Sequence, residues 1–100
     1  MVGEPVEIAI EALIWDEEIE RHFARHLVNH GNVMAVLDSD PITHENLPGR
    51  SGTHVMIGPD DSGRILYVSI KPTDMPNVWE PVTGWQSRLA RRLWLRERGH

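Results

Sequence analysis

Residues 53–70, THVMIGPDDSGRILYVSI, contain the pattern on which the predicted fold depends. Strand-like runs at Thr53–Ile57 and Arg64–Ile70 flank a turn-forming segment, in which Gly63 can take the left-handed conformation that such a turn needs. The second run is almost continuously apolar rather than alternating, which is typical of a strand that is covered on both faces. The sequence therefore predicts a β-hairpin whose second strand lies in the middle of a sheet.

A further strand and a helix are predicted after the hairpin. Val78–Thr83 is a third strand-like run, and Pro81 indicates that this strand lies at an edge or carries a bulge. From Ser87 onward the spacing of Leu89 and Leu93 predicts a helix with arginines on its other sides.

The segment before the hairpin predicts a strand and two helices. Val6–Ile14 alternates apolar and acidic residues, which is the pattern of a half-buried strand. Glu17–Leu27 is predicted to be helical, with acidic residues in its first turn, where the helix dipole favours them. Asn29 is a suitable cap for a second helix that ends before Pro41, although Gly31 could instead end a single longer helix. We prefer two helices, and Pro41–Gly52 is predicted to be a loop.

These elements predict a single α+β domain over residues 1–100, with the order β-α-α-β-β-β-α. Strands gathered after a helical pair favour an antiparallel sheet with the helices packed mainly on one face. A chain of this length holds one hydrophobic core.

The amino-acid composition limits both the cellular location and the site chemistry that we expect for this protein. The absence of cysteine excludes disulfides and thiolate zinc sites. The apolar runs are far shorter than the roughly 20 residues of a membrane helix, and the first residues are acidic where a signal peptide is basic, so we expect a soluble, cytoplasmic protein with no membrane partner.

The formal net charge is −5, yet the last fifteen residues hold five arginines and one glutamate. A basic segment of this kind can contact phosphate locally.

The order of elements and several short motifs resemble the BrnT-type toxins of bacterial toxin–antitoxin systems. The resemblance begins in IWDEEIERHFARHLVNHGNVMAVLDSDP, with its Trp-Asp-Glu start, a helix ending near Arg-His, and a second helix with a Val-x-x-Val-Leu face. It continues through the hairpin, a third strand and an arginine-rich last helix, and covers roughly residues 8–96.

The resemblance implies a RelE-like fold, metal-independent endoribonuclease activity on RNA, and a cognate antitoxin protein as partner. It implies no cofactor. The family usually has a small residue and then Arg at the junction of the last strand and helix, whereas here Gly84 is followed by Trp85. The helix glutamate of the family falls near Ala90 or Arg91, and its closing aromatic, commonly Tyr, corresponds to Trp94. These departures indicate a weakened ribonuclease.

The last helix supplies the main candidate site residues. Arg88, Arg91 and Arg92 are spaced at i, i+3 and i+4 and share one helix face, and the arginine fork suits phosphate oxygens. We assign Arg88 and Arg91 to catalysis, and Arg92, Arg96 and Trp85 to contacts with RNA or a partner. A solvated helix face, or one that pairs with acidic groups of an antitoxin, explains the same pattern.

The histidines offer a general base. His26, at the Arg-His position of the resemblance, and His54, on the first hairpin strand, are the candidates, because histidine titrates near neutral pH. Packing of His26 beside Phe23 is the alternative. Tyr67 lies on the second hairpin strand. Because side chains alternate between the two faces of a sheet, only every second residue of each strand can face the site. His22, His26 and His30 recur every four residues but have no evident third ligand, so we expect no metal site.

The function that the resemblance implies, and with which these residues agree, is a toxin-type endoribonuclease. A non-catalytic interaction module on the same fold, which binds an acidic partner protein through the basic helix, is the alternative. A metal-dependent enzyme is a third possibility that rests on the histidine spacing alone.

Overall fold

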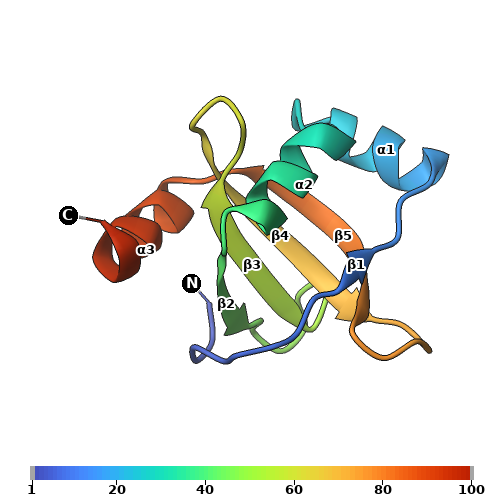
Figure 1. The fold of residues 1–100 in the computed structure, drawn as a ribbon, viewed down its shortest axis with the longest axis horizontal. Coiled ribbons are helices and arrows are strands. Elements are labelled where there is room, and N and C mark those ends of the chain that lie inside the picture. The colour runs from blue at the N-terminus through green and yellow to red at the C-terminus, as the bar shows by residue number, and fades with distance from the viewer. Residues whose placement is uncertain (1, 100) are drawn as a thin grey trace.

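A hairpin of two buried strands forms the centre of a five-stranded sheet in the computed structural model, which describes residues 2–99 (Figure 1). The elements in chain order are β1 (Ala12–Leu13), α1 (Glu17–Ala24), α2 (His30–Asp38), β2 (Ile42–Glu45), β3 (His54–Pro59), β4 (Ile65–Pro72), β5 (Val78–Gln86) and α3 (Arg88–Arg98). The strand order is β1-β5-β4-β3-β2. The predicted α+β class and the central hairpin are confirmed.

The sheet is mixed rather than purely antiparallel, which corrects the predicted topology. β1 pairs in parallel with β5, while the other neighbouring strands pair in antiparallel fashion. The order also contains one strand more than predicted, because β2 lies within the segment Pro41–Gly52 that was expected to be a loop. The register of β5 against β4 shifts at Ser69/Ile70, in agreement with the irregularity that Pro81 predicts.

The predicted strand Val6–Ile14 is wrong for most of its length, since only Ala12 and Leu13 are in a strand. The chain here crosses the sheet instead of running along one edge. The Val6 amide donates to the Thr43 carbonyl of β2 at 3.1 Å, whereas the Glu11 amide donates to the Asn77 carbonyl, just before β5, at 2.8 Å. Because β2 and β5 are separated by two strands, the segment between these bonds cannot pair with either. We call residues 3–11 the N-terminal strap (Figure 1).

The two-helix prediction for the next segment is confirmed, with a first helix shorter than expected. The Asp16 side chain accepts from the Ile19 amide at 2.8 Å and caps α1, and Asn29 forms a reciprocal capping box with Asn32 at the start of α2. α1 ends at Ala24 and not at Leu27, which has a φ of 59° and turns the chain towards α2.

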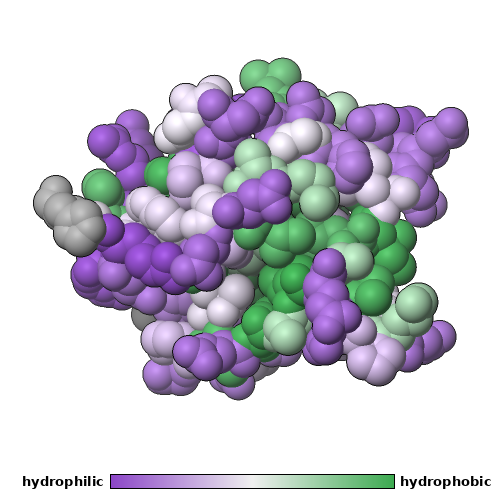
Figure 2. Space-filling model, viewed as in Figure 1, coloured by the Kyte–Doolittle hydropathy of each residue, from purple (hydrophilic) through white to green (hydrophobic). Residues whose placement is uncertain are grey.

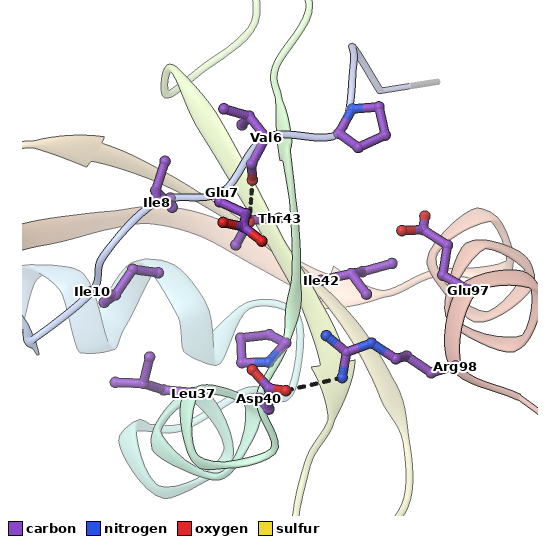
Figure 3. A pocket seen from close by; sticks show the side chains of 12 residues that line it. Val6, Glu7, Ile8, Ile10, Leu37, Asp40, Ile42, Thr43, Glu97 and Arg98 are labelled. Atoms are coloured by element: carbon purple, nitrogen blue, oxygen red, sulfur yellow. Dashed lines mark hydrogen bonds and ion pairs between the residues drawn. The ribbon is translucent and has the colours of Figure 1, made fainter.

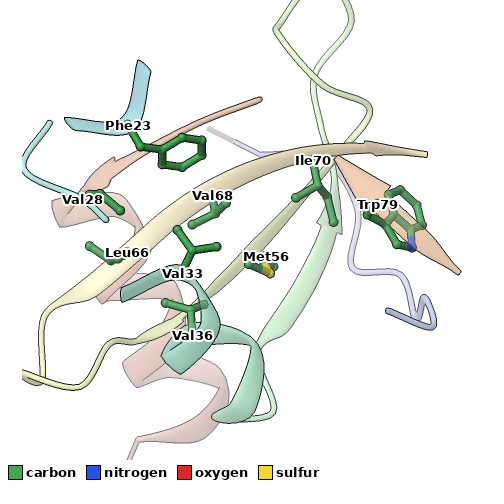
Figure 4. Packing of buried hydrophobic residues seen from close by; sticks show 9 residues of the cluster. All are labelled: Phe23, Val28, Val33, Val36, Met56, Leu66, Val68, Ile70 and Trp79. Carbon is green, nitrogen blue, oxygen red and sulfur yellow. The ribbon is translucent and has the colours of Figure 1, made fainter. Parts of the chain in front are cut away.

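The alternating side chains of β4 enter two separate apolar layers. Leu66, Val68 and Ile70 pack in a cluster that also contains Phe23 of α1 and residues of α2 (Figure 4). Tyr67, between them, packs in a second cluster with residues of α3. α1 and α2 therefore cover one face of the sheet and α3 the other, so the helices lie mainly on one face, as predicted.

A buried histidine fixes β2 between the two ends of the chain. His44 is 3% exposed. Its Nδ1 donates to the Gly3 carbonyl oxygen at 2.9 Å, and its Nε2 lies 3.0 Å from a Glu97 carboxylate oxygen of α3. One imidazole thus joins the strap, the sheet and the last helix.

No helix within residues 2–99 is long and apolar enough to cross a membrane.

The hairpin turn also holds the end of α1 in place. The buried Asp60 carboxylate accepts hydrogen bonds from Ser62 and, at 2.9 Å, from the backbone and side chain of Arg64. Arg64 Nη1 in turn donates to the Leu27 carbonyl oxygen at 3.1 Å. Burial alone would raise the pKa of the Asp60 carboxyl, but these hydrogen bonds outweigh burial and lower the pKa below 3.8.

We predict that Asp60→Asn destabilises the fold by about 1–3 kcal/mol at pH 7, because the amide cannot accept all four hydrogen bonds. The folded-state pKa of Asp60 lies below the unfolded value, so its ionisation stabilises the fold above about pH 4 and this contribution is lost as the pH falls through the folded value. The free-energy difference between the two proteins, measured by urea unfolding, should therefore shrink from pH 5 to pH 2.

The neighbouring exposed Asp61→Asn is the matched control. It should change the free energy of unfolding by less than about 0.5 kcal/mol. A difference between wild type and Asp60→Asn that stays constant with pH would contradict the role of the ionised carboxylate.

Candidate functional site

The junction of β5 and α3 presents arginines beside an aromatic strand end. Ser87 accepts from the Ala90 amide at 3.1 Å and caps α3, so the helix begins at Arg88 immediately after the sheet. Ala90 and Leu93 are buried against the sheet. This anchoring leaves Arg88 and Arg91 exposed at the start of the helix.

An aromatic row lies next to these arginines. Tyr67 of β4 and Trp85 of β5 are direct cross-strand partners, and their rings stack with centroids 4.6 Å apart. The exposed His26, which follows α1, places its ring 5.9 Å from that of Trp85. We call His26, Tyr67, Trp85, Arg88 and Arg91 the arginine–aromatic site.

Two adjoining hollows join the histidine side of this site to the arginine side. One is lined by His26, Trp85 and Gln86. The other, of about 360 Å³, is lined by Gln86, Arg88 and Arg91 together with Ile65 and Ser87. Because Gln86 belongs to both hollows, the surface from His26 to Arg91 is continuous.

Packing under β5 sets the position of His26. An added Cβ at Gly84 would lie 2.7 Å from Cε2 of Phe23, so the phenyl ring rests directly on the glycine backbone. Phe23 is fully buried, and the chain turns at Leu27 immediately after His26. The bond from Arg64 to the Leu27 carbonyl then fixes this turn.

The Tyr67 hydroxyl is held at the other end of the row. It donates to Asn46 Oδ1 at 3.2 Å, and Asn46 Nδ2 donates to the carbonyls of Ser51 and Gly52. Burial raises the pKa of Tyr67, and the nearby positive charge of Arg50 offsets part of this rise. The phenol is therefore protonated at neutral pH and acts as a hydrogen-bond donor.

The structure brings together four of the predicted site residues and separates His54 from them. His26, Trp85, Arg88 and Arg91 border the two hollows. His54 is the register partner of Ile70 and lies on the face covered by α1 and α2, where its ring packs edge-on against Trp79 at 5.0 Å. Its Nδ1 also lies 2.7 Å from Thr53 Oγ1. His54 therefore lies on the opposite face of the sheet from Tyr67 and cannot serve this site as a base.

The remaining arginines of α3 lie outside the hollows. Arg92 and Arg96 are exposed and line neither of them. Arg98 pairs with Asp40 at 3.2 Å and lies over the ring of Trp94. Within residues 2–99, no carboxylate lies within 4.0 Å of Arg88, Arg91, Arg92 or Arg96.

The three evenly spaced histidines have different surroundings. His22 approaches the edge of Phe23, His26 approaches Trp85, and His30 stacks on Trp15 with ring centroids 4.9 Å apart. The part of the chain that the structure describes contains no group of three or more His, Asp or Glu side chains that could hold a metal ion.

No protein-family model, curated protein sequence or solved structure matches this chain. The geometry and chemistry of the site are therefore the basis for its function.

We predict that Gly84→Ala destabilises the fold by about 1–3 kcal/mol, since the new methyl group overlaps the Phe23 ring. The double variant Gly84→Ala with Phe23→Leu should recover part of this loss compared with the sum of the two single changes. Thermal and urea unfolding measure both effects.

Gly31→Ala in α2 is the control, because its added methyl group meets only the Asn29 side chain, at 3.3 Å. It should change stability by less than about 1 kcal/mol. Equal stability of the Gly84→Ala and wild-type proteins would mean that Phe23 does not rest on β5.

Proposed function

We propose that this chain is a toxin-type endoribonuclease that cleaves RNA at the arginine–aromatic site without a metal ion. The observation that supports the proposal is the gathering of His26, Trp85, Arg88 and Arg91 on one continuous surface. These residues come from the turn after α1, from β5 and from α3. They are also four of the residues that the resemblance to BrnT-type toxins and the residue chemistry single out.

Each residue has a role in the proposed reaction. Trp85 stacks on a base of single-stranded RNA. His26 removes the proton from a ribose 2′-hydroxyl, whose oxygen attacks the adjacent phosphorus and displaces the 5′-oxygen. Arg88 and Arg91 bind the phosphate and stabilise the charge of its pentacovalent state. The leaving oxygen takes its proton from water, and the product is a 2′,3′-cyclic phosphate.

The rate should be modest in this proposal. The strand–helix junction carries Trp85 where BrnT-type toxins usually have a further arginine, and Trp94 stands in place of their closing tyrosine. Trp94 packs beside Arg98 and lines neither hollow, so it supplies no proton there. Loss of one cation from such a site costs on the order of 100-fold in rate. A cytoplasmic location and a cognate antitoxin belong to the same proposal.

A non-catalytic module that binds an acidic partner protein is the second candidate. The exposed arginines of α3 favour it, because Arg88, Arg91, Arg92 and Arg96 have no carboxylate partner within residues 2–99. The acidic net charge of the chain repels RNA and an acidic protein alike at a distance, so either partner depends on the local positive charge of α3.

We predict slow cleavage of a single-stranded RNA oligonucleotide in the presence of chelator, and none of its 2′-O-methyl analogue. His26→Gln should lower the single-turnover rate by about 100-fold or more while the Kd for the uncleavable analogue stays within a few-fold. Arg88→Gln with Arg91→Gln should weaken both cleavage and binding.

Arg96→Gln, an equal charge change on the same helix outside the hollows, is the control and should cleave at nearly the wild-type rate. Full activity in His26→Gln would exclude the proposed base. Intact RNA at high protein concentration, with no effect of expression on bacterial growth, would favour the interaction module.

A further inference from the structure

A hollow of about 620 Å³ lies on the N-terminal side of the molecule and shares no residue with the arginine–aromatic site (Figure 3). The strap forms one side of it, and the turn between α2 and β2 and the end of α3 form the others. Its apolar lining comes from Val6, Ile8, Ile10, Leu37 and Ile42. A hydrophobic surface patch lies over the strap and the sheet edge in the same region (Figure 2).

Between Val6 and Glu11, the backbone amides of the strap are unpaired within the described residues. Hydrogen bonds hold the strap at Val6 and at Glu11. Between them, the Ala9 carbonyl accepts from Trp79 Nε1 at 2.9 Å. Within the described residues, the amides of residues 7–10 have no backbone or side-chain acceptor.

The strap nevertheless has the side-chain geometry of a strand. Glu7, Ala9 and Glu11 are exposed, while Ile8 and Ile10 between them are partly buried against the core. This alternation is that of extended chain. An extended segment with free amides, beside a hollow whose lining mixes apolar and charged side chains, is an arrangement to which a peptide can add as a further β-strand.

The charges around the hollow select the kind of peptide. Asp40 is paired with Arg98, and Glu97 is hydrogen-bonded to His44. Glu7 has no cationic partner among residues 2–99, and the exposed Glu4 and Glu11 flank it along the strap. A basic side chain of the occupant would therefore find a carboxylate here, whereas phosphate would be repelled.

We propose that the strap and its hollow bind an extended, basic segment of a partner protein, which pairs with the main chain of residues 7–10. Its apolar side chains alternate into the hollow, and a lysine or arginine faces Glu7. A second copy of this chain does not match the site, because the strap itself offers the acidic side chains Glu7 and Glu11 and no lysine or arginine.

Synthetic peptides test the proposal on the full chain. The probe is an acetylated, amidated octapeptide of alternating lysine and valine. One control peptide has N-methylated valines, which removes the donors from one edge, and the other has glutamate in place of lysine. Binding is measured by calorimetry, and the site by amide NMR shifts and hydrogen exchange.

We expect the lysine–valine peptide to bind, to shift the amide signals of Ile8 and Ile10, and to slow amide exchange within residues 7–10. The N-methylated and glutamate peptides should bind at least about tenfold more weakly. Glu7→Lys should weaken binding of the first peptide by about tenfold, whereas Asp74→Lys, the same charge change in an exposed loop away from the hollow, should not.

The proposal would be overturned if the N-methylated peptide bound as tightly as the lysine–valine peptide, or if Asp74→Lys weakened binding as much as Glu7→Lys. Either result would mean that the peptide binds through non-specific charge attraction to the acidic chain. No binding up to millimolar peptide would overturn it as well. Concentration-dependent dimers in sedimentation, abolished by Glu7→Lys, would assign the strap to a second copy instead.

Discussion

The burial of β4 on both faces is the constraint on which the rest of the structure depends. A strand with apolar side chains on both sides needs a covering layer on each. α1 and α2 supply one layer over Leu66, Val68 and Ile70, and α3 supplies the other over Tyr67. Because α3 has to reach the second face directly from β5, its first turn lies at the strand end, and this places Arg88 two residues beyond the end of β5.

The sequence predicts those elements whose signals are local. The hairpin, the two capped helices and the last helix depend on turn residues, caps and periodicity within a few positions, and all of them form. β2 could not be predicted in this way, since Ile42–Glu45 is a short segment that mixes apolar and polar residues. The hydrogen-bond partners of its buried His44 lie 41 and 53 positions away in the sequence. The strap has a strand pattern and fails to form one because distant bonds hold its two ends on different strands.

The candidate site likewise has a part that local signals predict and a part that depends on long-range contacts. The sequence predicts the shared helix face of the arginines and a contact role for Trp85, and the structure places Trp85, Arg88 and Arg91 along one surface. His54 and Tyr67 could not be separated before the register was known, because one residue of slip exchanges the faces of a strand. No local signal marks Asn46 and Arg50, because their segment has the composition of an ordinary loop and their proximity to Tyr67 depends on the folded sheet.

The single imidazole between Gly3 and Glu97 has a consequence for how the molecule assembles. Contacts between segments this far apart in the chain carry a large entropic cost of loop closure unless the intervening residues are already ordered, and folds rich in such contacts form slowly. The last helix and the first residues are therefore expected to join together in a late step of folding. Removal of either end of the chain leaves one ring nitrogen of the buried His44 without a hydrogen-bond partner. A change at one end therefore destabilises the packing at the other end.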